Sequence, residues 1–403
     1  MASLIFAWAS GVAWGWSCND AGAETVMTLN SLAAVDPMAV CNDGSPAGYY
    51  FSPGAAESTT FLVYLAGGGQ CYDEASCVAR GNGSQYPHHD CAASNASKPC
   101  FLSSKDYGPT CNKTGIFSAE ASANLPLHDA HKAYLPYCSS DAHMGDGAAF
   151  GMEFRGQRIV RAMLADLNAR HGMGAGARVV FGGGSAGGRG AMVHLDAVAE
   201  ALAAEPFSAA EVVGFLDSPF YVDEAPYPPA HFVGFPAEMA EAYAHFNASA
   251  VAGAPCAAAH GDEPWKCLFG QYRMPFLETP YLMVASQFDG WQISNEVLGY
   301  NGIVPEPTLD AAELAYVDAL ANDTLSLVSA LPTKKVSDPK SSIFSIACYS
   351  HHVSEKTKFA TEKTDTNISQ ADALFWFLEP SITTSLKYID DSTIAGFRMC
   401  ASA

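Results

Sequence analysis

Short apolar runs alternate along the chain with longer segments in which apolar residues recur at helical spacing. The runs have the length of buried strands and lie at residues 61–65, 178–181, 212–216 and 281–285. The helical segments lie at residues 154–168 and 190–203. This alternation predicts an α/β fold with a mostly parallel central sheet and helices on both faces. Ligands of such sheets bind at the carboxyl ends of the strands, where Asp217 and Asp289 follow two predicted strands.

The length and composition favour one large domain. The chain has 403 residues, of which 49% are hydrophobic, and this is enough for a sizeable core. Two alanine-rich stretches, residues 197–204 and 237–250, are typical of surface helices. We find no internal repeat or low-complexity linker in the sequence. We therefore expect a single domain over residues 24–403.

The first residues resemble a secretory leader. Residues 4–16 are apolar and have the length of a signal-peptide core, and Ala21-Gly22-Ala23 resembles a cleavage site. No Lys or Arg precedes this stretch, and cleavage there would remove Cys18 and leave an odd number of cysteines. We predict a signal peptide over residues 1–23. No other part of the sequence approaches the length of a transmembrane span.

The charge of the chain excludes several classes of partner. There are 42 acidic and 21 basic residues, so the net charge is −21. Such a charge disfavours nucleic acid, heparin-like glycans and anionic membranes. We expect no nucleic-acid partner, no membrane span and a monomer.

The cysteines and the glycosylation sequons point to an extracellular protein. The twelve cysteines are even in number and lack the repeated CxxC pairs of a zinc site, so disulfides are expected. Short spacing favours the pairs Cys71–Cys77 and Cys256–Cys267. Asn-x-Ser/Thr sequons stand at Asn82, Asn95, Asn112, Asn247, Asn322 and Asn367. Together these features predict secretion, to the extracellular space or the cell wall.

Residues 179–196, VVFGGGSAGGRGAMVHLD, carry the strongest chemical signal. Residues 183–187 fit the G-x-S-x-G pattern between a strand end and a helix start, which is typical of a nucleophile elbow with Ser185 at its tip. The N–H of Ala186 would then face a developing oxyanion. A glycine-rich phosphate loop or a dinucleotide site is the alternative, but no acidic residue follows at a strand end about 20 residues on, as a dinucleotide site requires.

A nucleophilic serine needs a histidine base and an acid that orients it. In α/β-hydrolases the acid and then the histidine follow the serine along the chain. If Asp289 is the acid, only His351 and His352 remain as the base. If Asp217 is the acid, the eligible bases also include His231, His245 and His260. Adjacent residues of an extended loop point in opposite directions, so only one of His351 and His352 can reach the serine.

A second oxyanion donor is expected from the loop after the strand at residues 61–65. Residues 67–69 are three glycines, as in the HGGG-type loops of esterases, although a plain turn fits this segment equally well. A disulfide between Cys71 and Cys77 would brace that loop. The histidine-containing segments at residues 88–91 and 128–131 raise the question of a metal, but they lie in a cysteine-rich insertion and a loop. We expect no metal and no organic cofactor.

A series of blocks, in order from about residue 40 to residue 400, resembles the Notum and pectin acetylesterase family of secreted α/β-hydrolases. The blocks are CNDGSPAGYY (41–50), FLVYLAGGGQC (61–71), PYCSSD (136–141), FRGQRIVRAMLADL (154–167), GGSAGG (183–188), LDSPFYVD (216–223), WKCLFGQY (265–272), FDGWQI (288–293) and ACYSHH (347–352). The resemblance implies an α/β-hydrolase fold with loop insertions braced by disulfides.

The resemblance also implies roles for individual residues. The family's catalytic triad falls on Ser185, Asp289 and His351. Its oxyanion hole falls on the backbone amides of Gly68, Gly69 and Ala186. The disulfides Cys41–Cys138 and Cys348–Cys400 are implied in the same way, whereas the pairing of Cys18, Cys91, Cys100 and Cys111 stays open.

The sequence departs from the family near the predicted oxyanion loop. The family usually has an acidic residue where Ala66 stands and an aromatic residue where Gly69 or Gln70 stands. These positions help to line the acyl pocket, so the acyl group is not implied by the resemblance. Notum-like proteins also bind sulfated glycans through basic surfaces, a property that the net charge argues against here.

These observations predict a secreted serine carboxylester hydrolase that works through an acyl-enzyme. The expected substrate is an acylated extracellular molecule, most simply an acetylated polysaccharide such as pectin. One alternative is Notum-like removal of a fatty acyl group from a protein or a lipid. Another is a non-catalytic binding protein on a hydrolase scaffold, and a protease or lipase would share the triad without the family blocks.

Overall fold

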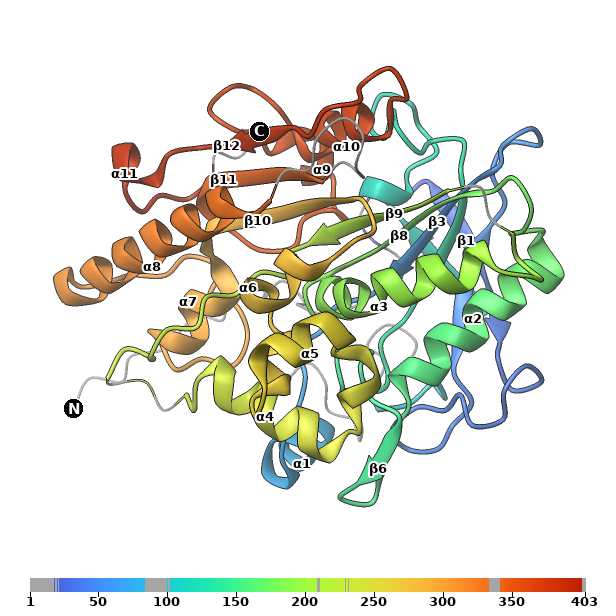
Figure 1. Cartoon of the computed structure of the whole chain (residues 1–403), viewed down its shortest axis with the longest axis horizontal. Coiled ribbons are helices and arrows are strands. Elements are labelled where there is room, and N and C mark those ends of the chain that lie inside the picture. Colours follow the sequence, from blue (N-terminus) through green and yellow to red (C-terminus); the bar gives the residue numbers. More distant parts are fainter. Residues whose placement is uncertain are drawn as a thin grey trace, which may run out of the picture.

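The apolar runs of the sequence form the middle strands of a large sheet in the computed structural model (Figure 1). The model describes residues 18, 20, 22–83, 100, 102–208, 211–228, 230, 232–332 and 341–400. The strands are β1 Thr25–Ser31, β2 Gly48–Ser52, β3 Thr60–Leu65, β4 Thr110–Lys113, β5 His131–Leu135, β6 Gly147–Ala149, β7 Met152–Phe154, β8 Arg178–Gly184, β9 Glu211–Asp217, β10 Tyr281–Asp289, β11 Ser342–Ser350 and β12 Lys387–Ile389.

Helices connect these strands and cover the sheet. The α-helices are α1 Glu74–Asn82, α2 Gly156–His171, α3 Ala186–Ala203, α4 Phe235–His245, α5 Ala254–His260, α6 Gly270–Arg273, α7 Gly290–Glu296, α8 Ala311–Ala330, α9 Lys358–Thr361, α10 Gln370–Leu378 and α11 Ser392–Ala395. Short 3₁₀ helices are η1 Gly115–Phe117, η2 Ala248–Val251, η3 Pro264–Leu268 and η4 Met274–Phe276.

Most of the sheet is parallel, as predicted. Among the described residues, ten strands form one sheet in the order β12-β11-β10-β9-β8-β3-β5-β2-β1-β4, and β6 pairs with β7 in a separate hairpin. Neighbouring strands from β12 to β5 are parallel, whereas β2, β1 and β4 extend one edge through antiparallel pairs. Gly183 of β8 lies opposite Leu65 of β3, and Gly184 lies opposite Asp217 of β9. The carboxyl ends of these three strands therefore meet at one level.

Helices lie on both faces of the sheet, which confirms that part of the prediction. Gly214 of β9 faces α3, because a Cβ at Gly214 would lie 2.7 Å from the side chain of Leu195. The next residue, Phe215, makes an edge-on ring contact with Phe359 of α9. Since successive residues of a strand point to opposite faces, α3 and α9 cover different sides. Figure 1 shows α2 and α3 crossing in front of the strands.

The helix boundaries differ slightly from those expected. The helix predicted from residue 154 begins at Gly156, because residues 152–154 instead form β7 of the small hairpin. The helix predicted from residue 190 begins at Ala186, directly after Ser185. The alanine-rich stretch at residues 237–250 is α4 followed by η2, but α4 is not a simple surface helix, since Glu238 is buried.

All four disulfides whose cysteine pairs were predicted are present, and the structure shows a fifth. Cys41–Cys138, Cys71–Cys77, Cys256–Cys267 and Cys348–Cys400 are bonded. Of the cysteines left open, Cys18 pairs with Cys111. Cys100 is also disulfide-bonded, and Cys91 lies outside the described residues.

The Cys18–Cys111 bond joins a residue of the predicted leader to β4. A domain that begins at residue 24 would lack Cys18, which the bond attaches to β4, and Asp20, whose carboxylate lies 3.0 Å from the Lys113 ammonium. The folded part therefore reaches at least to Cys18. The predicted leader falls mainly on residues 1–17, outside the described residues, and stays a prediction.

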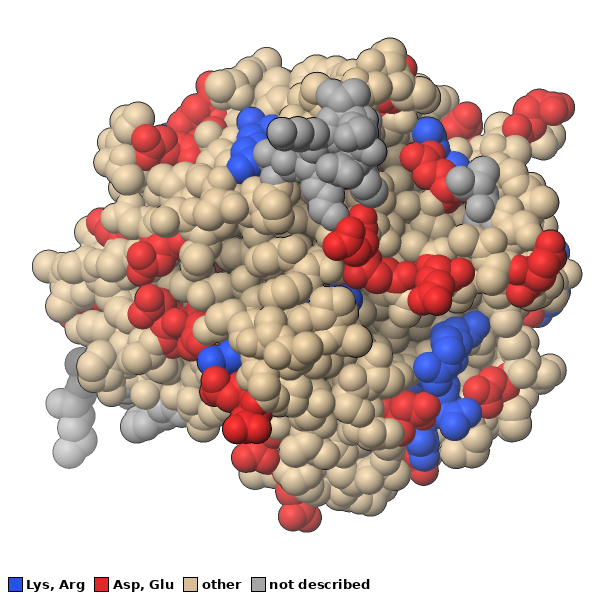
Figure 2. Space-filling view, viewed as in Figure 1, with Lys and Arg blue, Asp and Glu red and all other residues tan. Residues whose placement is uncertain are grey.

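Acidic side chains are spread over the face that Figure 2 shows, and the largest group of basic side chains lies along α2. Arg155 at the N-cap of α2 and Arg158 and Arg161 in its first turns all pair with the carboxylate of Asp146. Among the described residues, no helix is long and apolar enough to cross a bilayer.

Candidate active site

Ser185 occupies the sharp turn between β8 and α3. Its backbone lies in an unusual region with φ of 55° and ψ of −122°, and its N–H donates to the carbonyl of Asp217 at 2.9 Å. A Cβ at Gly187 would lie 2.0 Å from the carbonyl oxygen of Leu65, so only glycine lets α3 start this close to β3. The backbone strain and the close approach are those of a nucleophile elbow, which places the Ser185 hydroxyl above the sheet.

Ser185, His351 and Asp289 form one hydrogen-bonded chain. The Nε2 of His351 lies 2.8 Å from the Oγ of Ser185, and its Nδ1 lies 2.7 Å from the Oδ2 of Asp289. All three residues are buried, with 5–6% of their surface exposed. This is the arrangement in which a carboxylate fixes the imidazole tautomer and the imidazole can accept the serine proton.

The fold holds the carboxylate of Asp289 in place through its second oxygen. Asp289 ends β10 and caps α7, and its Oδ1 accepts the N–H groups of Trp291 and Gln292 at 3.0 Å each. One oxygen thus caps the helix and the other faces His351. Asp is a preferred residue at the start of a helix, and in the sequence FDGWQI the helix α7 starts directly after the strand β10.

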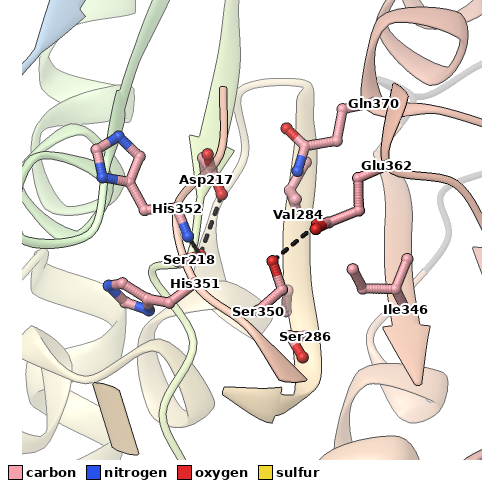
Figure 3. A pocket seen from close by; sticks show the side chains of 11 residues that line it. Asp217, Ser218, Val284, Ser286, Ile346, Ser350, His351, His352, Glu362 and Gln370 are labelled. Atoms are coloured by element: carbon pink, nitrogen blue, oxygen red, sulfur yellow. Dashed lines mark hydrogen bonds between the residues drawn. The ribbon is translucent and has the colours of Figure 1, made fainter. Parts of the chain in front are cut away.

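The alternative acid, Asp217, is used elsewhere. Its Oδ2 accepts the N–H and hydroxyl of Ser354 at 3.0 and 2.6 Å, and its Oδ1 accepts the hydroxyl of Ser218. These contacts tie the end of β9 to the chain that follows His351 and His352. Figure 3 shows Asp217 and Ser218 with both histidines among the residues that line a small pocket at the ends of β9 and β10.

The other candidate histidines that the structure describes bond or pack elsewhere. His352 turns inward with a φ of 48°, and its Nε2 lies 3.2 Å from the Tyr64 hydroxyl and 3.0 Å from the Glu355 carboxylate. His245 pairs with Glu241, and the ring of His260 packs on Tyr272. His231 lies outside the described residues.

The glycine loop after β3 lies against the elbow. A Cβ at Gly67 would come within 2.6 Å of the Gly184 carbonyl, and Gly69 has a positive φ of 66°. The disulfide Cys71–Cys77 ties the end of this loop to α1, and Asp73 caps the start of that helix. Ala186 is the first residue of α3, so its N–H has no acceptor within the helix.

A pocket with about 260 Å³ of space opens beside the serine. It is lined by Gly69, Gln70, Ser185, Ala186, Arg189, Tyr221, Glu238 and Trp291. Gly69 and Ala186 thus share the pocket with Ser185, and Gly68 directly precedes Gly69 on the glycine loop, with a φ of 142°. The polar groups Arg189 and Glu238 were not foreseen from the sequence, although Arg189 stands only one helical turn after Ser185.

Burial dominates the electrostatics of this pocket. Arg189 is 4% exposed and Glu238 is 8% exposed. Burial raises the pKa of Glu238 to about 8, even though Arg189 opposes the shift. Burial also lowers the pKa of Arg189 and raises that of Tyr221. At neutral pH the pocket therefore holds a guanidinium beside a carboxyl that is mostly protonated.

The described residues contain one group of possible metal ligands, Cys256, His260 and Cys267. The two sulfurs are joined in a disulfide and provide no thiolate ligand. The histidine-containing segment at residues 88–91 lies outside the described residues. In the other segment, His131 bonds to Gly54 and Ser58 and stacks on Phe61.

The sheet, the elbow and the loops at its carboxyl edge define the α/β-hydrolase class. Residues 20–393 match the family described as Pectinacetylesterase, and the chain belongs to this family. It is 27% identical over 320 residues to the human palmitoleoyl-protein carboxylesterase NOTUM, across 78% of this chain and 59% of that protein. It is 28% identical over 280 residues to pectin acetylesterase 11 of Arabidopsis thaliana, across 68% of this chain and 65% of that protein.

Solved structures agree on the fold. The structure titled as the Wnt deacylase Notum from Drosophila superposes with a TM-score of 0.77 at 24% identity, over 94% of this chain and all of that chain. The match to the Drosophila sequence covers 83% of this chain but only 46% of that protein. The chain thus spans about half to two thirds of the curated relatives it matches.

Proposed function

We propose that the protein is a carboxylester hydrolase with Ser185 as its nucleophile. The observation that supports this most directly is the buried hydrogen-bonded chain from Ser185 through His351 to Asp289. Ser185 Oγ attacks the ester carbonyl while His351 takes its proton and then gives it to the leaving alcohol. Water, deprotonated by the same histidine, then releases the acid from the acyl-enzyme. Asp289 orients the imidazole and stabilises its cationic form.

The amides of Gly68, Gly69 and Ala186 are proposed to bind the oxyanion. Gly69 and Ala186 line the pocket beside Ser185, and Gly68 directly precedes Gly69 on the glycine loop. Backbone N–H groups held in advance by the fold stabilise developing charge without reorganisation. Neither this step nor the acyl transfer requires a metal or an organic cofactor.

The substrate is proposed to carry a short acyl group, most simply acetyl on a polysaccharide such as pectin. The pocket beside Ser185 is small and its walls include Arg189, Glu238 and Gln70. A fatty acyl chain needs an apolar wall, because burying polar groups against alkyl carbon leaves them without partners. The competing proposal is Notum-like removal of a fatty acyl group from a protein or a lipid. A non-catalytic binding protein fits less well, since none of the three catalytic side chains is replaced.

The proposed location is outside the cell. Five disulfides join described residues, and bonds of this kind persist in oxidising compartments. Four sequon asparagines, Asn82, Asn247, Asn322 and Asn367, are exposed. The proposed partner is an acylated extracellular substrate, bound by a monomer.

Hydrolysis of p-nitrophenyl esters by wild type and Ser185→Ala tests the proposal. The variant should lose several orders of magnitude in kcat with an unchanged Tm, because the triad acts as a unit. Ser392→Ala is the matched control: Ser392 is buried, its hydroxyl has no hydrogen bond among the described residues, and it should keep full activity. A folded Ser185→Ala protein that still turns over would refute the mechanism. A wild-type rate that increases from acetate to palmitate would favour the fatty-acyl alternative.

A further inference from the structure

Arg189 is a buried cation that has no carboxylate partner among the described residues. Its side chain is 96% shielded from solvent, yet no ion pair within 4.0 Å is found for it in this part of the chain. Arg273 is equally buried, but its guanidinium lies 3.4 Å from the carboxylate of Asp196.

Arg189 uses only part of its hydrogen-bonding capacity. Its Nη2 donates to the Oε1 of Gln70 at 2.9 Å and to the Sδ of Met239 at 2.8 Å. Its Nε is buried without an acceptor in the described part of the protein. The guanidinium lies 5.7 Å from the centre of the Tyr221 ring and lines the pocket beside Ser185.

Glu238 shares the pocket but does not neutralise Arg189. No hydrogen bond or ion pair within 4.0 Å joins the two side chains in the described residues. The raised pKa of Glu238 also leaves this carboxyl mostly protonated at neutral pH. A protonated carboxyl can donate a hydrogen bond to a bound oxygen. The pocket thus offers a positive guanidinium together with a neutral donor.

A buried charge without a partner is costly, and its replacement by an apolar side chain is often neutral or stabilising. A desolvated charge of this kind that lines a cleft marks a candidate functional site. The guanidinium fork matches the two oxygens of a carboxylate better than a single acceptor. Four residues of helix separate Arg189 from Ser185, which is roughly 6 Å along the axis. A group bound here is therefore only a few bonds from the reacting ester.

We propose that Arg189, assisted by Glu238, binds a carboxylate that the acylated substrate carries near its ester, as in an O-acylated uronic acid. This inference rests on the proposed ester hydrolase function and assigns a specificity-determining residue to the same site. Arg189 then acts on specificity: it holds the substrate in place and takes no part in proton transfer.

The experiment compares a mono-O-acetylated methyl galacturonoside as its free acid and as its methyl ester. Wild type should prefer the acid in kcat/KM by about 10- to 100-fold, the range for a hydrogen bond to a charged group. Arg189→Met should remove the preference and still hydrolyse the methyl ester. Arg273→Met, the control, should keep the preference. The assays are run at about 0.15 M salt, where the net charge of −21 is screened beyond about 8 Å.

Two further measurements separate this inference from the function on which it rests. Calorimetric binding of the two compounds to Ser185→Ala, with and without Arg189→Met, reports the subsite without turnover. Binding that depends on Arg189 but no hydrolysis by wild type would support the subsite and refute the hydrolase. Hydrolysis of both compounds at equal rates, or a preference that survives Arg189→Met, would refute the subsite. Arg189→Met should also leave Tm unchanged or raise it, and a clear fall in Tm would indicate a structural role instead.

Discussion

Replacement of Lys113 by methionine should destabilise the protein strongly. The Lys113 ammonium is 1% exposed and lies 2.7 Å from the carboxylate of Glu355 and 3.0 Å from that of Asp20. Its Nζ also lies 4.4 Å from the centre of the Tyr134 ring. Lys113→Met leaves two carboxylates without their cation in a buried site.

The magnitude follows from breaking a buried pair on one side only. Such changes cost about 3–5 kcal/mol of unfolding free energy, because an uncompensated charge remains. That is a large fraction of a total stability of about 5–15 kcal/mol. The double variant Lys113→Met/Glu355→Gln removes one of the stranded charges and should recover part of the loss. Lys105→Met is the control, since Lys105 pairs with Asp43 on the surface and should change little.

The pH dependence has a definite sign. Burial alone would raise the pKa of Glu355, but Lys113 and His352 together outweigh burial and hold that pKa well below its ordinary value of 4.5. The contribution of the Glu355 carboxylate to the free energy of unfolding is therefore present above pH 4.5 and is lost as the pH falls. Glu355 and Asp20 outweigh burial in the same way and raise the pKa of Lys113 above 10.5, so its contribution is lost at high pH. The difference between wild type and variant should be constant from about pH 5 to pH 10.

Urea unfolding of the four proteins across this pH range measures the effect. A loss below about 1 kcal/mol for Lys113→Met at pH 7 would show that the site is effectively solvated. A double variant no more stable than the single variant would show that the two carboxylates are not the source of the loss.

Five substitutions at the site have separate expected outcomes. Asp289→Asn should lower kcat on the order of 10⁴-fold through the wrong histidine tautomer, with little change in Tm because an amide oxygen still caps α7. Asp217→Asn should instead lower Tm and leave kcat within about tenfold. If ester-hydrolysis kinetics show the larger loss of kcat for Asp217→Asn, then Asp217 is the acid. Gly184→Ala should lower both Tm and kcat, since the new Cβ would lie 2.1 Å from the His352 ring, and a thermal melt with unchanged Tm would contradict this. His352→Ala should keep kcat within about tenfold, while His351→Ala should abolish turnover, and side-by-side kinetics of the two decide which histidine is the base.

The sequence predicted the middle of the sheet well and its edge poorly. The buried strands β3, β8, β9 and β10 are continuous apolar runs, which are recognisable without any partner. β1 alternates buried and exposed residues within TVMTLNS, a weak signal that depends on pairing with β2 and β4. The hairpin of β6 and β7 has only three residues in each strand and carries no pattern at all.

The candidate site was predictable where chain order limits the choice. After Asp289 the sequence contains only two histidines, so the base was narrowed to a pair by elimination. Which of the two histidines faces Ser185 depends on tertiary contacts that the sequence does not show. His352 has a positive φ, and its ring bonds to Tyr64 and Glu355 instead. Glu238 was missed because an acid in an alanine-rich helix looks solvated until the packing of α4 is known.

The disulfide Cys18–Cys111 limits how far the amino-terminal end can be trimmed. A recombinant protein that starts at residue 24 would contain eleven cysteines instead of twelve, and Cys111, which is fully buried at β4, would become a free thiol. The same truncation deletes Asp20, so Lys113 loses one of its two carboxylate partners. This weakens the group of buried charges formed by Lys113, Glu355 and His352. Thiol titration and non-reducing gels would reveal the odd cysteine as intermolecular dimers. Recombinant production should therefore retain the chain from Cys18 onward.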